Sequence, residues 1–139
     1  MEPESTGDLL MAAARSMRGA MGQALARYDV TPGQARALRV ALADDPVRLS
    51  VLAERLRIAP RSATEVVDAL EARGLVERLP DPTDRRAVGV RPTAEGRRVA
   101  SLLGEARREA SAEHLGALPA ADRAKLDRIL RRLLEAGRS

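Results

Sequence analysis

Residues 60–91 read PRSATEVVDALEARGLVERLPDPTDRRAVGVR, and this stretch decides the fold that we expect. Pro60 suits the first turn of a helix, because the backbone N–H groups there have no intrahelical partners. Apolar residues then recur at steps of three and four as far as Leu70, which is the period of an amphipathic helix. Gly74 can adopt the positive φ that ends such a helix. The pattern therefore predicts a helix over residues 60–73.

The remainder of the stretch has the pattern of a β-hairpin with a long loop. Residues 75–79 and 87–91 are short and rich in apolar residues, and we expect them to pair as strands. In the second strand, Val88 and Val90 alternate onto one face. Residues 80–86, between the strands, include two prolines and are too many for a tight turn. We interpret this hairpin as a wing.

A shorter amphipathic helix precedes this stretch. Residues 49–57 predict a helix with Ser50 as its N-cap. Its inward-facing residues are apolar: Leu52, Ala53 and Leu56. Only two residues separate this helix from Pro60. Two short helices joined by a tight turn and followed by a hairpin make a winged helix-turn-helix, in which the second helix lies in the DNA major groove and the wing reaches the backbone or the minor groove.

The wing also resembles that of a known family, the multiple-antibiotic-resistance regulator (MarR) family of bacterial transcription factors. The residues that carry the resemblance are segment 75–78, Asp81, Pro82, segment 84–86, Thr93 and Gly96. The family pattern places an aspartate two residues before an arginine, as Asp84 and Arg86 are, and a Leu-Thr pair beyond. Here Pro92 precedes Thr93 and removes a backbone donor, so we expect a local difference where the second strand meets the next helix. The resemblance implies a DNA-binding regulator that acts as a homodimer.

Long helices are predicted on both sides of the winged segment. Residues 8–28 carry an apolar stripe, and a second helix begins after Thr31. Beyond the wing, Thr93 opens a third long helix and Pro119 marks the start of a terminal one. These helices carry more apolar surface than one small winged domain can cover. We therefore expect them to pack against a second copy of the chain in a two-fold dimer.

The expected fold class is mainly α with a small β-hairpin wing (α+β), a winged helix-turn-helix domain with dimerisation helices at both ends. We assign residues 1–30 to an N-terminal dimerisation helix, residues 31–92 to the DNA-binding domain and residues 93–139 to C-terminal dimerisation helices. Two-fold symmetry presents two recognition helices to half-sites about 34 Å apart. The expected partner is therefore double-stranded DNA that carries an inverted repeat.

The positive charge of the chain is concentrated in the predicted DNA-binding segment. The net charge is +4 and the sequence pI is about 10.8. Residues 47–98 hold 11 arginines and 8 acidic residues, whereas residues 1–46 hold 5 arginines and 6 acidic residues. The net charge is therefore +3 for residues 47–98 and −1 for residues 1–46. Because the positive segment coincides with the predicted winged helix-turn-helix, it favours a nucleic-acid partner.

Three candidate DNA contacts lie at the exposed start of the predicted recognition helix. They are Arg61, Ser62 and Thr64, whose guanidinium and hydroxyl groups can reach phosphates or base edges. The plain alternative is a solvated helix face. Glu65 can accept a hydrogen bond from cytosine or pair with Arg61 at i,i+4, and we favour the pairing.

Three more candidates lie at the tip of the wing: Asp84, Arg85 and Arg86. We expect Asp84 to hold one of the two arginines in a bidentate pair, which would order it for entry into the minor groove. The alternative is a local salt bridge that stabilises the turn, and the two readings are compatible. Arg86 matches the arginine of the family pattern.

Composition argues against several other classes of protein. One histidine, no cysteine, no glycine-rich phosphate loop and no acidic cluster with metal-ligand spacing leave no nucleophile and base to propose. We therefore expect neither an enzyme nor a cofactor or metal site. The lack of cysteine excludes a disulfide or a thiol switch. Without a long apolar run or a signal-like leader, the expected location is the cytoplasm and no membrane partner is expected.

The resemblance also implies a small-molecule effector, commonly an anionic aromatic, and a ligand-responsive repressor. Spacing does not identify the residues that line its site. Met17, Met21, Tyr28 and His114 are adaptable or polar-tipped candidates, but core packing is the more common role of such Met and Tyr residues and solvation that of such a His, so we assign none of them to the ligand. The alternative function is a helical interaction module whose basic wing binds RNA or an acidic protein.

Overall fold

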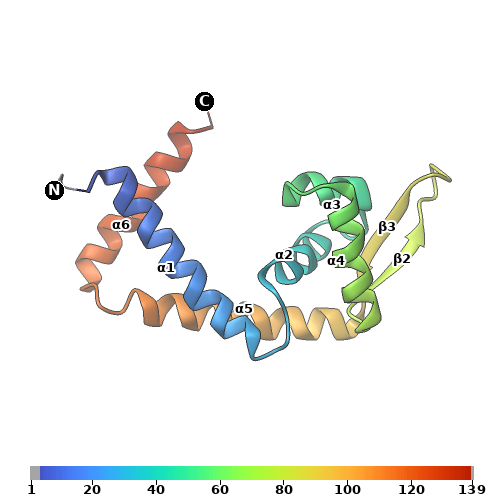
Figure 1. The fold of residues 1–139 in the computed structure, drawn as a ribbon, viewed down its shortest axis with the longest axis horizontal. Coiled ribbons are helices and arrows are strands. Elements are labelled where there is room, and N and C mark those ends of the chain that lie inside the picture. Colours follow the sequence, from blue (N-terminus) through green and yellow to red (C-terminus); the bar gives the residue numbers. More distant parts are fainter. Residues whose placement is uncertain (1–3, 139) are drawn as a thin grey trace.

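The computed structural model describes residues 4–138, so residues 1–3 and 139 of the predicted terminal segments lie outside the described part. Helices dominate, and a small sheet forms the wing (Figure 1). The elements are α1 (Thr6–Ala26), α2 (Pro32–Ala43), β1 (Val47–Arg48), α3 (Leu49–Leu56), α4 (Pro60–Ala72), β2 (Val76–Pro80), β3 (Val88–Pro92), α5 (Ala94–His114) and α6 (Ala120–Ala136). The predicted fold class is confirmed.

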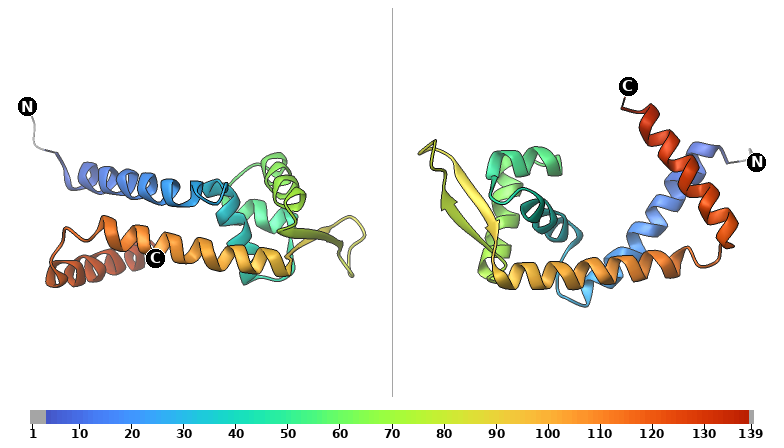
Figure 2. Two further views of the ribbon diagram at one scale, coloured as in Figure 1. Left: turned by 90° about the horizontal axis from the view of Figure 1, so that it is seen from below. Right: turned by 180° about the vertical axis from the view of Figure 1, so that it is seen from behind.

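The elements form a winged unit at one end and an open arm at the other. The winged unit holds α2, α3, α4 and the sheet, and α5 runs from it into the arm (Figure 1). There α1 packs along α5, as Figure 2 shows from two sides. The terminal helix α6 makes few contacts with the other elements, and none of its residues is buried.

Local signals in the sequence explain where the helices begin. Ser5 and Asp8 form a capping box at α1, which starts two residues earlier than predicted. Prolines occupy the first turns of α2 and α4 as expected. The predicted cap at Ser50 is wrong, because β1 leads directly into α3 and Ser50 already lies within its first turn. The side chain at the actual N-cap, Arg48, makes no capping hydrogen bond.

The sheet is antiparallel, with strand order β1-β3-β2. Both long strands lie one residue later than predicted, and β3 includes Pro92 opposite Val76. The proline is tolerated because β1 pairs only as far as Val90, so no ladder partner in the described chain needs its missing N–H. The amide of Thr93 then donates to the carbonyl of Leu75 at 3.0 Å, which continues the pairing into the start of α5.

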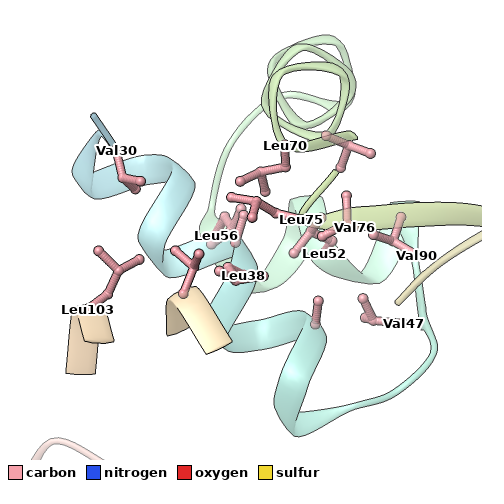
Figure 3. Packing of buried hydrophobic residues seen from close by; sticks show 14 of the residues in the cluster. Val30, Leu38, Val47, Leu52, Leu56, Leu70, Leu75, Val76, Val90 and Leu103 are labelled. Atoms are coloured by element: carbon pink, nitrogen blue, oxygen red, sulfur yellow. The ribbon is translucent and has the colours of Figure 1, made fainter. Parts of the chain in front are cut away.

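The core is centred on the winged unit and extends to Leu25 of α1 and to Val99 and Leu103 of α5 (Figure 3). Its largest fully buried side chains come from α2, α3, α4 and all three strands: Leu38, Leu52, Leu70, Val47, Val67, Val76 and Val90. The predicted inward residues of α3 are all buried. Of the two valines expected on one face of the second strand, Val90 is buried and Val88 is 37% exposed. The arm is different, because Ile129, Leu133 and Leu134 of α6 are more than half exposed.

Candidate nucleic-acid interface

The start of α4 presents the first group of predicted contacts. Arg61 is exposed, whereas Ser62 and Thr64 are half-buried. The hydroxyl of Thr64 donates to the carbonyl of Pro60 at 3.1 Å, so part of its hydrogen-bonding capacity is used within the helix. Arg61 is therefore the predicted helix residue with the most accessible polar group.

The expected ion pair between Arg61 and Glu65 is wrong. Both side chains are exposed, and among the described residues neither takes part in an ion pair within 4.0 Å. An i,i+4 pair with the cation on the N-terminal side is the weaker orientation, and such exposed pairs contribute only tenths of a kcal/mol, about 0.3. Arg61 is thus left available to an external anion.

The far end of α4 is fixed to the sheet by an arginine of β2. Arg78 donates to Asp68 at 2.6 Å and to Glu71 at 2.8 Å, and Glu71 also accepts the backbone amide of Arg78 at 3.1 Å. These contacts join the recognition helix to the base of the wing. The helix and the hairpin are therefore held in one relative orientation.

The wing is organised around Asp81, whose side chain is only 11% exposed. Its carboxylate accepts from the amide of Thr83 at 2.8 Å, the hydroxyl of Thr83 at 2.7 Å and the amide of Asp84 at 3.2 Å. Arg48 of β1 adds a charged donor at 2.7 Å and also donates to the hydroxyl of Thr83 at 3.2 Å. These donors, the Thr83 groups above all, lower the pKa of Asp81 to about 2. The carboxylate therefore remains charged near neutral pH and keeps the loop ordered.

Sequence reasoning did not assign this role to Asp81 or Arg48. The Asp-Pro-Thr sequence is a signal for the turn, because aspartate side chains bond to backbone amides two residues on. Arg48 carries no comparable signal, since its partner Asp81 is 33 residues away.

The second group of predicted contacts lies at the tip of the wing. Asp84 does not form the expected bidentate pair with an arginine; its carboxylate instead accepts the backbone amide of Arg86 at 2.9 Å. A short side chain in a turn reaches nearby backbone more readily than a long guanidinium group. Arg85 and Arg86 are both exposed, and neither forms an ion pair in the described part of the chain.

A groove lies between the α3–α4 turn and the wing, and we call it the wing groove. Its polar and charged lining residues are Arg48, Ser50, Glu54, Arg57, Thr64, Asp84 and Arg86. The groove therefore brings together three of the predicted residues, Thr64, Asp84 and Arg86, and adds two arginines that the sequence did not single out. Arg61, Ser62 and Arg85 are not part of its lining.

A second, larger cavity of about 820 Å³ lies among α1, α2 and α5, and we call it the arm cleft. Its walls are mostly apolar, with Met21, Leu25 and Leu103 among them. Six arginines also line it: Arg18, Arg36, Arg39, Arg97, Arg107 and Arg108. Arg97 is paired with Asp45, whereas the other five form no ion pair within residues 4–138. Apolar walls with unpaired cations suit an anion that has an apolar body.

Only one of the four sequence candidates for a ligand contact, Met21, lines the arm cleft. Met17, Tyr28 and His114 do not line it. The Nε2 atom of His114 instead lies 3.0 Å from the Oγ atom of Ser16. The arginines were missed because they come from three helices that the sequence pattern does not bring together.

Comparison with known proteins identifies the winged unit. A sequence model of the MarR family matches residues 30–88, which span α2 to the first residue of β3. The winged unit is therefore similar to the MarR family. Over 87 residues it is 29% identical to the HTH-type transcriptional repressor MdtR of Bacillus subtilis, covering 63% of this chain and 56% of the relative. The matched stretch spans only about half the length of the curated relatives.

Solved structures of the MarR family extend the likeness to the helices outside residues 30–88. The reduced form of MarR from E. coli is 25% identical, with a TM-score of 0.85, and covers 96% of this chain and 99% of that one. A cysteine-to-serine mutant of the same MarR, in complex with operator DNA, is also 25% identical, with a TM-score of 0.77 and 92% of both chains covered. The arm is therefore part of the fold that this chain shares with these structures.

The similarity agrees with the prediction that the chain is not an enzyme, because both curated relatives are named as transcriptional regulators. Among residues 4–138, no group of three or more His, Cys, Asp or Glu side chains is placed to hold a metal ion. Over the same residues, no helix combines the length and apolar character needed to cross a membrane.

Proposed function

We propose that this protein is a dimeric, sequence-specific DNA-binding transcriptional regulator, a ligand-responsive repressor of an inverted-repeat operator that works in the cytoplasm. The observation that carries the proposal is the exposure of Arg61 at the start of α4 and of Arg85 and Arg86 on the wing, all three without ion-pair partners in the described chain. The winged unit presents a helix for the major groove and a cationic hairpin beside it. The repressor named MdtR and the MarR–operator complex support this assignment.

We assign DNA binding and dimerisation to different parts of the chain. Residues 31–92 bind DNA, and residues 1–30 and 93–139 form the dimer. The support for the dimer is the apolar face of the arm: Leu9, Leu10, Met11, Leu118, Ile129, Leu133 and Leu134 are all substantially exposed. Exposed apolar side chains concentrated in one part of a protein mark an interaction site. Two recognition helices per dimer multiply the affinity for a duplex with two half-sites.

Replacing Arg86 with alanine is expected to weaken binding to every duplex, specific or not. Arg86 is exposed on the wing, and a phosphate contact releases counterions irrespective of base sequence. The slope of log affinity against log salt should therefore become shallower by about one unit for each lost contact. Fluorescence anisotropy over a salt series measures both the affinity and the slope.

Arg55→Gln is a matched control, because Arg55 is paired with Asp44 at 2.6 Å and does not line the wing groove. It removes the same charge and should leave the slope unchanged. An Arg86→Ala slope equal to that of the wild type would remove the wing from the mechanism. Competition by RNA as effective as that by duplex DNA would favour an RNA-binding module instead.

The effector is proposed to bind in the arm cleft as a small aromatic carboxylate. Phenolic acids should raise the melting temperature, since a ligand at 100 times its Kd stabilises the native state by about 2.7 kcal/mol. The neutral carboxamide of each acid is the control, because it keeps the shape and removes the charge that the arginines would hold. Differential scanning fluorimetry gives both shifts. Equal shifts for acid and amide, or no shift for any phenolic acid tested, would contradict an anion site in the cleft.

A further inference from the structure

The turn between α3 and α4 contains an arginine in a conformation that favours glycine. Arg57 has φ 55° and ψ 46°, in the left-handed region. Its amide donates to the carbonyl of Glu54 at 3.1 Å, and the amide of Ile58 donates to the carbonyl of Ala53 at 3.1 Å. These two bonds close the helix in the Schellman pattern, where the left-handed residue is usually glycine because a Cβ atom crowds the backbone.

The end of α4 provides a comparison, because the same kind of helix end has glycine there instead of arginine. There Gly74 has φ 71°, its amide donates to Glu71 at 2.9 Å, and the amide of Leu75 donates to Leu70 at 3.0 Å. The hydrogen-bond pattern matches that at the end of α3, but the left-handed residue is glycine. Folding alone favours glycine at both positions. The arginine at the end of α3 therefore calls for a reason outside the fold.

That reason lies in the wing groove, which Arg57 lines from the side of the turn while Arg86 lines it from the wing. Glu54 and Asp84 also line the groove, but Asp84 accepts the amide of Arg86. Among the described residues, neither Glu54 nor any other carboxylate lies within 4.0 Å of the Arg57 guanidinium as an ion-pair partner. The groove thus holds two guanidinium groups that are free to meet an anion.

We propose that Arg57 is a DNA-backbone anchor, which binds a phosphate on the opposite side of the wing groove from Arg86. Its left-handed backbone costs free energy, and we infer that the arginine is retained because it binds DNA. Strained residues persist where function requires them. The inference rests on the proposed DNA interface and adds Arg57 to it. It also implies that, at this residue, binding is gained at the expense of stability. The phosphate belongs to duplex DNA, since the groove adjoins the start of α4 at Pro60 and Thr64.

The decisive variant is Arg57→Gly, which should move two measurements in opposite directions. The melting temperature should rise by roughly 2–5 °C, because glycine adopts the left-handed conformation without strain. The affinity for a mixed-sequence duplex of about 30 base pairs, long enough for two half-sites, should fall. The slope of log affinity against log salt should become shallower by about 0.9 for each Arg57 that contacts a phosphate. Any duplex serves, because a phosphate contact carries no base preference.

Two controls separate charge from strain. Arg57→Lys keeps the charge and the strained backbone, so both its melting temperature and its affinity should stay near those of the wild type. Asp29→Gly relaxes another left-handed residue, with φ 57°, outside the wing groove. It should raise the melting temperature by a smaller amount, since aspartate tolerates this region better than arginine does, and it should leave the affinity unchanged.

The outcomes that would overturn the proposal are distinct. If Arg57→Gly binds the duplex with the affinity and salt slope of the wild type, the anchor is absent and the proposed DNA-binding function stands. If Arg57→Gly lowers the melting temperature together with the affinity, Arg57 acts through the fold and not through a phosphate. If the wild-type protein itself fails to bind duplex DNA, the proposed function fails and the anchor fails with it.

Discussion

The double variant Ile129→Asp and Leu133→Asp is expected to be monomeric at micromolar concentration and to bind its operator at least about 100-fold more weakly. Both side chains project from the same face of α6, one turn apart, and are 56% and 52% exposed in the single chain. In the proposed dimer they are covered, so two carboxylates there would be buried without partners. Loss of the dimer removes the gain from binding two half-sites at once. Sedimentation and anisotropy titrations measure the two effects.

The fold of the single chain should survive this change, because α6 contributes no buried residue. Helical circular dichroism and the burial of the winged core are therefore expected to be unchanged. Arg128→Asp is the matched control, since Arg128 lies on the opposite, polar face of α6 and is exposed. A double variant that remains dimeric, or a monomer that binds the operator as tightly as the wild type, would contradict the proposed role of the arm.

Replacing Gly96 with alanine should destabilise the protein by about 3 kcal/mol or more, the upper range for overpacking. A Cβ atom at Gly96 would lie 1.9 Å from the carbonyl oxygen of Leu75 and 2.9 Å from its carbonyl carbon. These are backbone atoms, held in place because the amide of Thr93 donates to the same carbonyl. The start of α5 would have to move away from β2. Urea denaturation at fixed protein concentration gives the free energy of unfolding.

Gly19→Ala supplies the comparison, because Gly19 is also helical but nothing lies within 4 Å of its Cβ position. Alanine there should stabilise the protein by about 0.5–1 kcal/mol, the usual gain over glycine within a helix. If Gly96→Ala were as stable as the wild type, the close approach of α5 to Leu75 would not be a real constraint. The same contact explains in physical terms why this position of the wing signature is glycine.

The sequence predicted those features that depend on neighbouring residues. Pro60 marked the start of the recognition helix, and Gly74 its end, because their backbone preferences act locally. Thr93 was expected to open α5, and its hydroxyl does accept the amide of Gly96 at 3.0 Å. The fold class followed from these signals together with the spacing of apolar residues.

The remainder depends on contacts between distant residues, which one sequence does not reveal. Arg48 reaches Asp81 only because the sheet places β1 beside the wing, and the arginines of the arm cleft meet only when three helices pack. The expected pair of Asp84 with an arginine was wrong because the backbone of Arg86 is a nearer donor. Arg57 was treated as an ordinary helix end, since nothing local distinguishes a strained arginine from a relaxed one.

The most direct test of the central claim is a hydroxyl-radical footprint of the protein on the DNA upstream of its own gene. Two symmetric copies of α4 and the wing predict two protected patches on one face of the duplex, with centres one helical turn, about 34 Å, apart. Protection of a single patch, or uniform weak protection along the whole duplex, would contradict a paired molecule that reads an inverted repeat.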